Sequence, residues 1–174
     1  MNSFTVLMTL LPVFFMIHDF EEIIFFPSWI KKNKSFLTDR FPVLSRPFLP
    51  HIEKMSATAF TVAVSVMFLL ICILTYLSVC LEFPYLWLAA FMGFFIHLFL
   101  HIAQWIILRR YVPVIVTSFL ALPYCICTFS IILQEKLFSV SEIIICTVAG
   151  LLILLPVIVS AHKFGVKADE WING

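Results

Sequence analysis

The stretch from Ser56 to Leu81 reads SATAFTVAVSVMFLLICILTYLSVCL and contains no charged side chain. A hydrocarbon core about 30 Å thick requires roughly 20 apolar residues in a helix that rises 1.5 Å per residue. Four further stretches, residues 4 to 26, 85 to 108, 111 to 133 and 141 to 164, meet the same requirement. Because they lack the alternating polarity of barrel strands, the five runs predict an all-α, polytopic transmembrane helix bundle.

The composition of the chain agrees with this fold class. Of the 174 residues, 63% are hydrophobic and 12% are charged, and the mean hydropathy is +1.10. A soluble domain carries about twice that share of charged residues. The net charge of +1 gives no basic excess for nucleic acid, which we exclude as a partner. We therefore predict a single transmembrane domain over residues 1–174, with the lipid bilayer as its main partner.

The distribution of Lys and Arg predicts the orientation of the spans. Ten of the eleven basic residues fall between spans one and two, between spans three and four, or after span five. They are Lys31, Lys32, Lys34, Arg40, Arg46, Lys54, Arg109, Arg110, Lys163 and Lys167. Only Lys136 falls on the other side. Since basic loops stay in the cytoplasm, we expect the N-terminus outside, the C-terminus inside and a cytoplasmic loop over residues 27–55. The prolines of that loop argue against one continuous helix.

The first span carries an unusual polar cluster. His18, Glu21 and Glu22 lie within residues 14–26, which are otherwise almost entirely apolar. A charged carboxylate at the bilayer centre costs on the order of 3 kcal/mol, so such groups normally face the bundle interior. The spacings i, i+3 and i+4 place these three side chains on one face of a helix, whereas Asp19 projects elsewhere.

The third span offers matching side chains at a similar depth. His97 and His101 are one helical turn apart, and Gln104 continues the same stripe. Counted from the basic ends of the spans, His18 and His101 lie about eight and seven residues deep. Thr117 lies about six residues into the fourth span, at a comparable depth. We therefore expect the two histidine-bearing helices to face each other near the cytoplasmic side.

Three imidazoles and two carboxylates suffice to hold a divalent metal, zinc or iron, with an open coordination position. The expected metal ligands are His18, Glu22, His97 and His101. Glu21 and Glu22 are the candidate catalytic carboxylates, with Glu21 as a ligand or a general base. Asp19, Gln104 and Thr117 are expected to contact the substrate or the ligands, although capping, pairing or a wet cavity are alternatives for Asp19. This set predicts a metal-dependent membrane enzyme, a hydrolase or an oxidase, that acts on a lipid-soluble or amphiphilic small molecule.

Two other interpretations fit the same residues. Pairs such as His18 with Glu22, or His101 with Glu21, also serve as interhelical ion pairs that hold a bundle together without a metal. Protonatable Glu and His side chains at mid-depth are equally the parts of a proton relay. The sequence therefore leaves open a small proton-coupled transporter or a membrane subunit.

The motif His18-Asp19-Phe20-Glu21-Glu22 resembles the signature of the HXXEE family of small bacterial integral membrane proteins. The later stretch from His97 to Thr117 is similar to a second block of that family, an Asn-x-x-x-His followed by a basic pair and a Pro-Gly-x-x-Thr segment. The resemblance covers most of residues 5 to 125. It implies an uncharacterised protein of a bacterial plasma membrane with suspected enzymatic activity. Its functional positions would be His18, Glu21, Glu22, His101 and Thr117, with Arg110 and Pro113 as framework.

Two positions depart from the family pattern. His97 stands where the family has Asn, which keeps a polar group that can bind a metal. Val114 stands where the family has Gly, so close backbone approach next to Pro113 is not expected.

Overall fold

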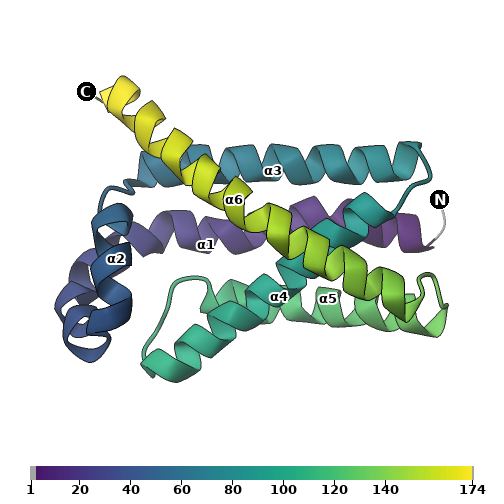
Figure 1. Ribbon diagram of the computed structural model, residues 1–174, viewed down its shortest axis with the longest axis horizontal. Helices are drawn as coiled ribbons and strands as arrows, with labels where there is room; N and C mark the ends of the chain where they lie inside the picture. Colours follow the sequence, from purple (N-terminus) through teal and green to yellow (C-terminus); the bar gives the residue numbers. More distant parts are fainter. Residues whose placement is uncertain (1–2, 174) are drawn as a thin grey trace.

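The computed structural model describes residues 3–173, apart from the side chains at positions 44, 48 and 51. Within that range all regular structure is helical (Figure 1). The helices are α1 (Ser3–Arg40), α2 (Pro42–Ile52), α3 (Ala57–Cys80), α4 (Tyr85–Leu108), α5 (Ile115–Gln134) and α6 (Val140–Asn173). All except α2 are long and apolar enough to cross a membrane, which confirms the predicted bundle of five spans.

The helix starts follow from local sequence. The hydroxyl of Ser56 accepts the amide hydrogen of Ala59 at 3.0 Å and so caps the beginning of α3. At the start of α6, Ser139 and Glu142 cap each other's backbone amides, a reciprocal arrangement that satisfies two otherwise free donors. Helix α2 begins with Pro42, whose missing amide hydrogen and fixed φ suit a first helical position.

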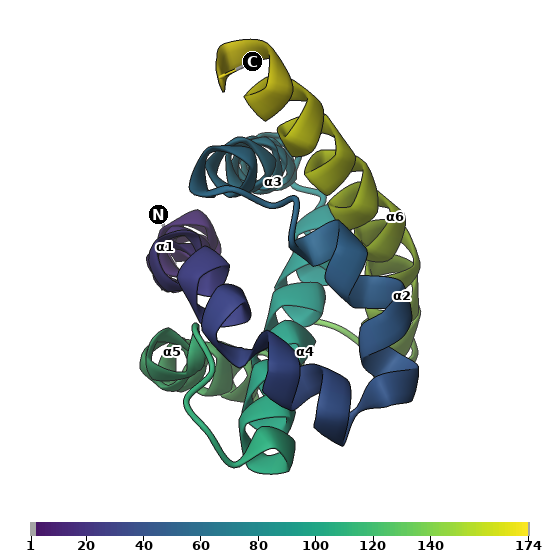
Figure 2. The same ribbon diagram turned by 90° about the vertical axis from the view of Figure 1, so that its left-hand side faces the viewer.

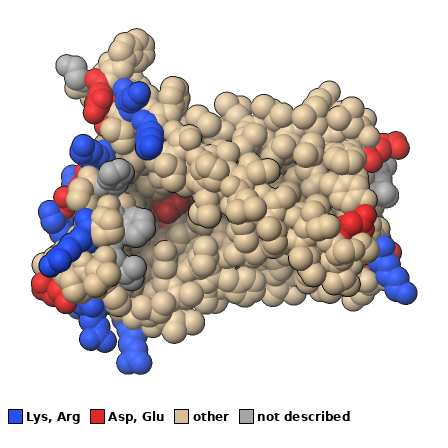
Figure 3. Space-filling view, viewed as in Figure 1, with Lys and Arg blue, Asp and Glu red and all other residues tan. Residues whose placement is uncertain are grey.

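Charged residues divide the bundle into two ends. The N-terminus and the α3–α4 and α5–α6 connections lie together, and the remaining connections and the C-terminus lie opposite (Figure 1). Lys and Arg gather at the second end, which we call the basic end, and the first is the far end (Figure 3). Between them the surface is almost free of charge, and side chains such as Leu69, Ile73 and Leu152 are more than half exposed. Such a belt is unsuited to water and suited to lipid.

Most of the stretch between spans one and two is helical, over residues 27–40 and 42–52. Helix α1 continues through Pro27 to Arg40, and the chain breaks only at Phe41 before α2 begins. The expectation that this stretch does not form one continuous helix is thus confirmed. Tertiary contacts hold the extension of α1: the indole of Trp29 donates a hydrogen bond to the Tyr111 carbonyl at 2.7 Å, and the Arg110 guanidinium lies over the Phe36 ring.

The far half of the bundle contains a core of large, fully buried side chains. Leu11, Trp87, Leu88 and Phe91 are fully buried there, and the Trp87 indole donates a hydrogen bond to the Met8 carbonyl. Helices α4 and α6 cross this core obliquely, while α1, α3 and α5 run side by side (Figures 1 and 2).

Two glycines bring α6 close to its neighbours. A Cβ at Gly150 would collide with the Ala89 backbone of α4. A Cβ at Gly165 would collide with the Ala59 backbone of α3. These contacts hold α6 against α4 through Gly150 and against the first turn of α3 through Gly165.

Candidate metal centre

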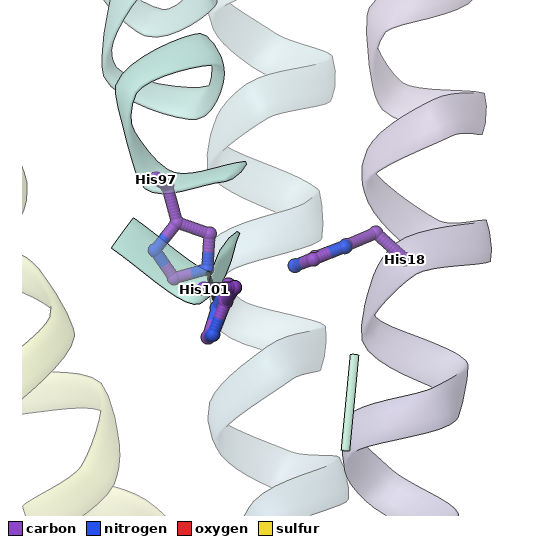
Figure 4. A group of neighbouring side chains, drawn as sticks. All are labelled: His18, His97 and His101. Atoms are coloured by element: carbon purple, nitrogen blue, oxygen red, sulfur yellow. Dashed lines mark hydrogen bonds between the residues drawn. The ribbon is translucent and has the colours of Figure 1, made fainter. Parts of the chain in front are cut away.

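Three histidines meet in the basic half of the bundle. His18 comes from α1, and His97 and His101 occupy successive turns of α4. One ring nitrogen from each can be chosen so that all three lie within 4.8 Å of one another. The Nε2 atoms of His97 and His101 are 2.8 Å apart, and the His18 ring points toward this pair (Figure 4).

His18 is the member of this trio whose polar atoms lack partners. Its side chain is fully buried, and neither ring nitrogen has a hydrogen-bond partner among the described residues. A buried polar group without a partner costs about 1–3 kcal/mol. The cost at one of the two nitrogens is removed if the nitrogen that faces His97 and His101 binds a further atom at their centre. The described part of the protein therefore leaves the hydrogen-bonding capacity of the His18 ring unused.

The separations fit a metal ion. Nitrogen ligands about 2.1 Å from one tetrahedral ion lie about 3.4 Å from each other. The Nε2 atoms of His97 and His101 are closer than this at 2.8 Å, and the whole set lies within 4.8 Å, so binding of one ion requires His97 and His101 to separate slightly and His18 to approach them. Three neutral imidazoles leave a fourth position open, the arrangement of catalytic rather than structural zinc sites.

Gln104 orients one of the three rings. Its side-chain oxygen lies 3.0 Å from Nδ1 of His101, so that Nδ1 carries the hydrogen and donates it. The lone pair of His101 is then on Nε2, which faces His97. Metal-binding histidines usually have their second nitrogen fixed in this way. Gln104 thus contacts His101, one of the expected metal ligands.

Glu21 is engaged elsewhere, at the start of α5. Its carboxylate accepts hydrogen bonds from the Tyr111 hydroxyl at 2.6 Å, the Thr117 amide at 2.8 Å and the Thr117 hydroxyl at 2.7 Å. The first turn of a helix has free amide hydrogens and a partial positive charge, which a carboxylate satisfies. Glu21 and Thr117 therefore join α1 to α5, and neither forms part of the histidine trio.

Sequence analysis did not identify Tyr111 as a partner of Glu21. One signal for a partner of Glu21 was available in the sequence. Thr117 is the third residue of α5, and the amide of a residue in the first turn of a helix needs an acceptor from outside that helix. The spacing of the motif did not indicate which of the two glutamates would supply that acceptor.

Glu22 and Asp19 lie on the other side of His18. Glu22 lines a cavity of about 1050 Å³, together with Phe26, Met55 and Phe60. The cavity is open on one face of the molecule, where an acidic surface is visible at the bottom of a hollow (Figure 3). Asp19 is 4% exposed, so its side chain is buried. Glu22 is not one of the residues in the histidine trio.

The connection between α4 and α5 contains a strained residue. Val114 precedes the first turn of α5 with φ 79° and ψ −6°, a left-handed conformation that is unfavourable for a β-branched side chain. It is buried, and its carbonyl accepts hydrogen bonds from the Ser118 amide at 2.8 Å and the Ser118 hydroxyl at 2.7 Å. The backbone here adopts the conformation that a glycine favours, although the residue is valine.

A comparison with known protein families identifies the family that shares this sequence motif. The family described as "Protein of unknown function with HXXEE motif" matches residues 9–128. No curated protein and no solved structure matches the chain. The matched range includes His18, Glu21, Glu22, all of α4 and the α4–α5 connection, whereas α6 lies outside it. Because the match extends over more than half of the sequence, the chain belongs to the HXXEE family.

Proposed function

We propose that the protein is a metal-dependent integral membrane enzyme, a hydrolase or an oxidase, that acts on a lipid-soluble or amphiphilic small molecule. The observation that carries the proposal is the buried His18 ring, which points at His97 and His101 and has no hydrogen-bond partner on either nitrogen within the described part of the chain. An ion pair or a packing role alone gives no reason to bury an imidazole without a partner.

The ligand set suits zinc or iron. Both ions bind imidazole, and three histidines with an open position occur in enzymes that activate water. When bound, such an ion supplies Lewis acidity, which polarises a substrate oxygen or makes bound water acidic. The surrounding hydrocarbon restricts the substrates to molecules that dissolve in the membrane.

The side chains around the trio have separate tasks in this proposal. Glu22, one helical turn from His18, faces the cavity and accepts or returns a proton during the reaction. Gln104 keeps the His101 lone pair directed at the centre. Glu21 has both oxygens engaged with α5, so we assign it the task of fixing α1 against α5 rather than a chemical step.

We further propose that the basic end lies in the cytoplasm and that the protein resides in the plasma membrane of a bacterium. Ten of the eleven Lys and Arg residues support this orientation by the positive-inside rule. Reporter fusions test it: a reporter that is active only in the cytoplasm is expected to be active at the C-terminus and inactive after Lys136.

Metal analysis tests the enzyme proposal. Protein purified in detergent without chelator is expected to contain about one zinc or iron per chain. His18→Ala is expected to contain less than about a tenth of that amount. His162→Ala is the matched control, because His162 is a half-buried histidine outside the trio and its loss should leave the metal content unchanged. A metal-free wild-type protein, or equal metal in His18→Ala and wild type, contradicts the proposal.

One observation favours proton-coupled transport as a second candidate. The Nε2 atoms of His97 and His101 are 2.8 Å apart, so in the absence of a metal one proton is shared between them. Such a pair can pass a proton along α4. Proteoliposomes distinguish the two functions: a transporter acidifies or alkalinises the lumen when its substrate is added, and the proposed enzyme does not.

A further inference from the structure

The cavity beside Glu22 is built from segments far apart in the sequence. Its walls come from α1, α2, the start of α3 and the last third of α6. With about 1050 Å³ it is at the upper end of the range of pockets for drug-sized ligands, about 300–1,000 Å³. It lies toward the basic end of the bundle, where a hollow is visible in the surface (Figure 3).

The lining of this cavity is divided by polarity. Phe26, Met55 and Phe60 form an apolar inner wall, and all three are buried or half-buried. The rim carries Lys54, Lys163 and Lys167, which are exposed. The single acidic residue of the rim is Glu170, so three lysines and one glutamate leave it positively charged. The other carboxylate, Glu22, lies in the interior on the α1 wall.

We propose that this cavity binds a membrane amphiphile with an anionic head group and an apolar chain. The lysines of the rim hold the head group at the level of the lipid surface, where basic side chains attract anionic lipids. The apolar chain lies against Phe26, Met55 and Phe60. Glu22 disfavours an anion in the interior, so the ligand is oriented with its head group outward.

The ligand source is the bilayer rather than the aqueous phase. The cavity opens beside Val159 and Phe164 of α6, two apolar residues that are more than half exposed on the lipid-facing belt. A water-soluble anion would interact with the lysines of the rim but would make no contact with the apolar wall. An amphiphile satisfies both parts of the lining. This inference rests on the proposed function, because it identifies the substrate class of the same site through Glu22, one turn from His18.

Binding of two lysolipids with the same acyl chain tests the inference. The probes are lysophosphatidylglycerol, which is anionic, and lysophosphatidylcholine, which is zwitterionic, titrated into protein in a neutral detergent and followed by native mass spectrometry. The wild type is expected to bind the anionic lipid at least tenfold more tightly. Lys163→Gln/Lys167→Gln is expected to weaken that binding about thirtyfold, or about 2 kcal/mol, since each lysine near an anionic surface contributes about 1 kcal/mol.

Lys31→Gln/Lys32→Gln is the matched control. It removes the same charge from the same end of the bundle, but these exposed lysines of α1 do not line the cavity. Less than a twofold change is expected in this variant. Equal losses in both double variants indicate general surface attraction and overturn the inference, as does equal affinity of the wild type for the two lysolipids. Displacement of the bound lipid by millimolar glycerol phosphate also overturns it, because the ligand is then a soluble anion.

Metal content is measured on the same protein samples. Stoichiometric metal without anionic selectivity overturns the amphiphile site and leaves the proposed enzyme standing. Anionic selectivity without metal supports the amphiphile site and contradicts the metal-dependent function. The two failures are therefore distinguishable.

Discussion

The two halves of the bundle use polar side chains differently. In the far half, the Trp87 indole and the Tyr124 hydroxyl donate hydrogen bonds to carbonyls of α1, Met8 at 3.1 Å and Leu7 at 2.8 Å. In the basic half, His18 is buried and neither of its nitrogens has a partner among residues 3–173 as far as their side chains are described, while Glu22 faces a cavity. Two hydroxyls in the far half, Thr75 and Thr128, also lack partners, but a threonine hydroxyl can rotate toward its own helix backbone and an imidazole cannot.

The difference separates a half that is built for stability from the half in which we propose the chemistry takes place. In the far half, full burial and the hydrogen bonds of Trp87 and Tyr124 hold α1 against α4 and α5. The basic half contains incomplete polar contacts and open volume, which reduce stability and leave room for a ligand. Substitutions in the far half should therefore lower the free energy of unfolding, whereas substitutions in the basic half should mainly change metal binding.

The largest expected effect is the loss of stability in Trp87→Ala. Trp87 is fully buried, stacks on Phe91 with ring centroids 4.9 Å apart and holds Met8 by a hydrogen bond. Truncation of such a residue costs about 3–5 kcal/mol in the free energy of unfolding. Denaturation of the purified protein in mixed micelles measures this value, and metal content should remain unchanged. A cost below about 1 kcal/mol would show that the far half is not the stabilising half.

The second effect distinguishes the two glutamates of the motif. Glu21→Gln replaces an oxygen that accepts hydrogen bonds by an amide that donates, next to the donors Tyr111 and Thr117. We expect a loss of about 1–3 kcal/mol in unfolding free energy with metal content retained. Glu22→Gln is the matched control and should change stability by less than about 0.5 kcal/mol, because Glu22 lines a cavity. The reverse order of these two values would exchange the roles given to the two carboxylates.

The third effect is on metal affinity and comes from Gln104→Leu. Without the Gln104 oxygen, His101 is free to adopt the wrong tautomer or orientation. Loss of such a supporting hydrogen bond lowers metal affinity about 10- to 100-fold. Competition with a chelator measures the dissociation constant, and Gln134→Leu at the end of α5 serves as the control. Unchanged affinity would mean that Gln104 does not support a metal ligand.

The smallest expected effect is on the stability of metal-free His18→Leu. Leucine fills a similar volume and removes two buried nitrogens that have no partner. The unfolding free energy of the metal-free protein should therefore stay constant or rise by about 1 kcal/mol. Metal binding should be lost in the same variant. A large destabilisation would show that His18 is a structural residue like Trp87.

Most of the fold could be predicted from hydropathy. The five spans were expected at residues where the structure has helices, because length and apolarity alone are sufficient to identify a membrane helix. The extension of α1 through Pro27 was not predicted. A proline removes only one helical hydrogen bond, and contacts made by Trp29, Lys34 and Phe36 hold the helix beyond it. Such contacts cannot be read from local sequence.

The candidate site was predicted in part. Helical spacing and depth brought His18, His97 and His101 together, and these three residues do meet. The same reasoning placed Glu21 and Glu22 on one face with His18. Successive residues of a helix are rotated by about 100°, so Glu21 and Glu22 flank His18 on opposite sides. One reaches α5 and the other faces the cavity near α6, and only the positions of these neighbouring helices decide between the two.

The left-handed valine has a consequence for how related sequences are recognised. At position 114 the backbone has a positive φ of 79°. The chain adopts this angle with a valine, although glycine would adopt it most easily. A search that scores residue identity alone would count this valine against membership, although the backbone geometry is retained. Candidate relatives are better compared by whether a helix start after the basic pair can receive the carboxylate of Glu21 than by the presence of glycine.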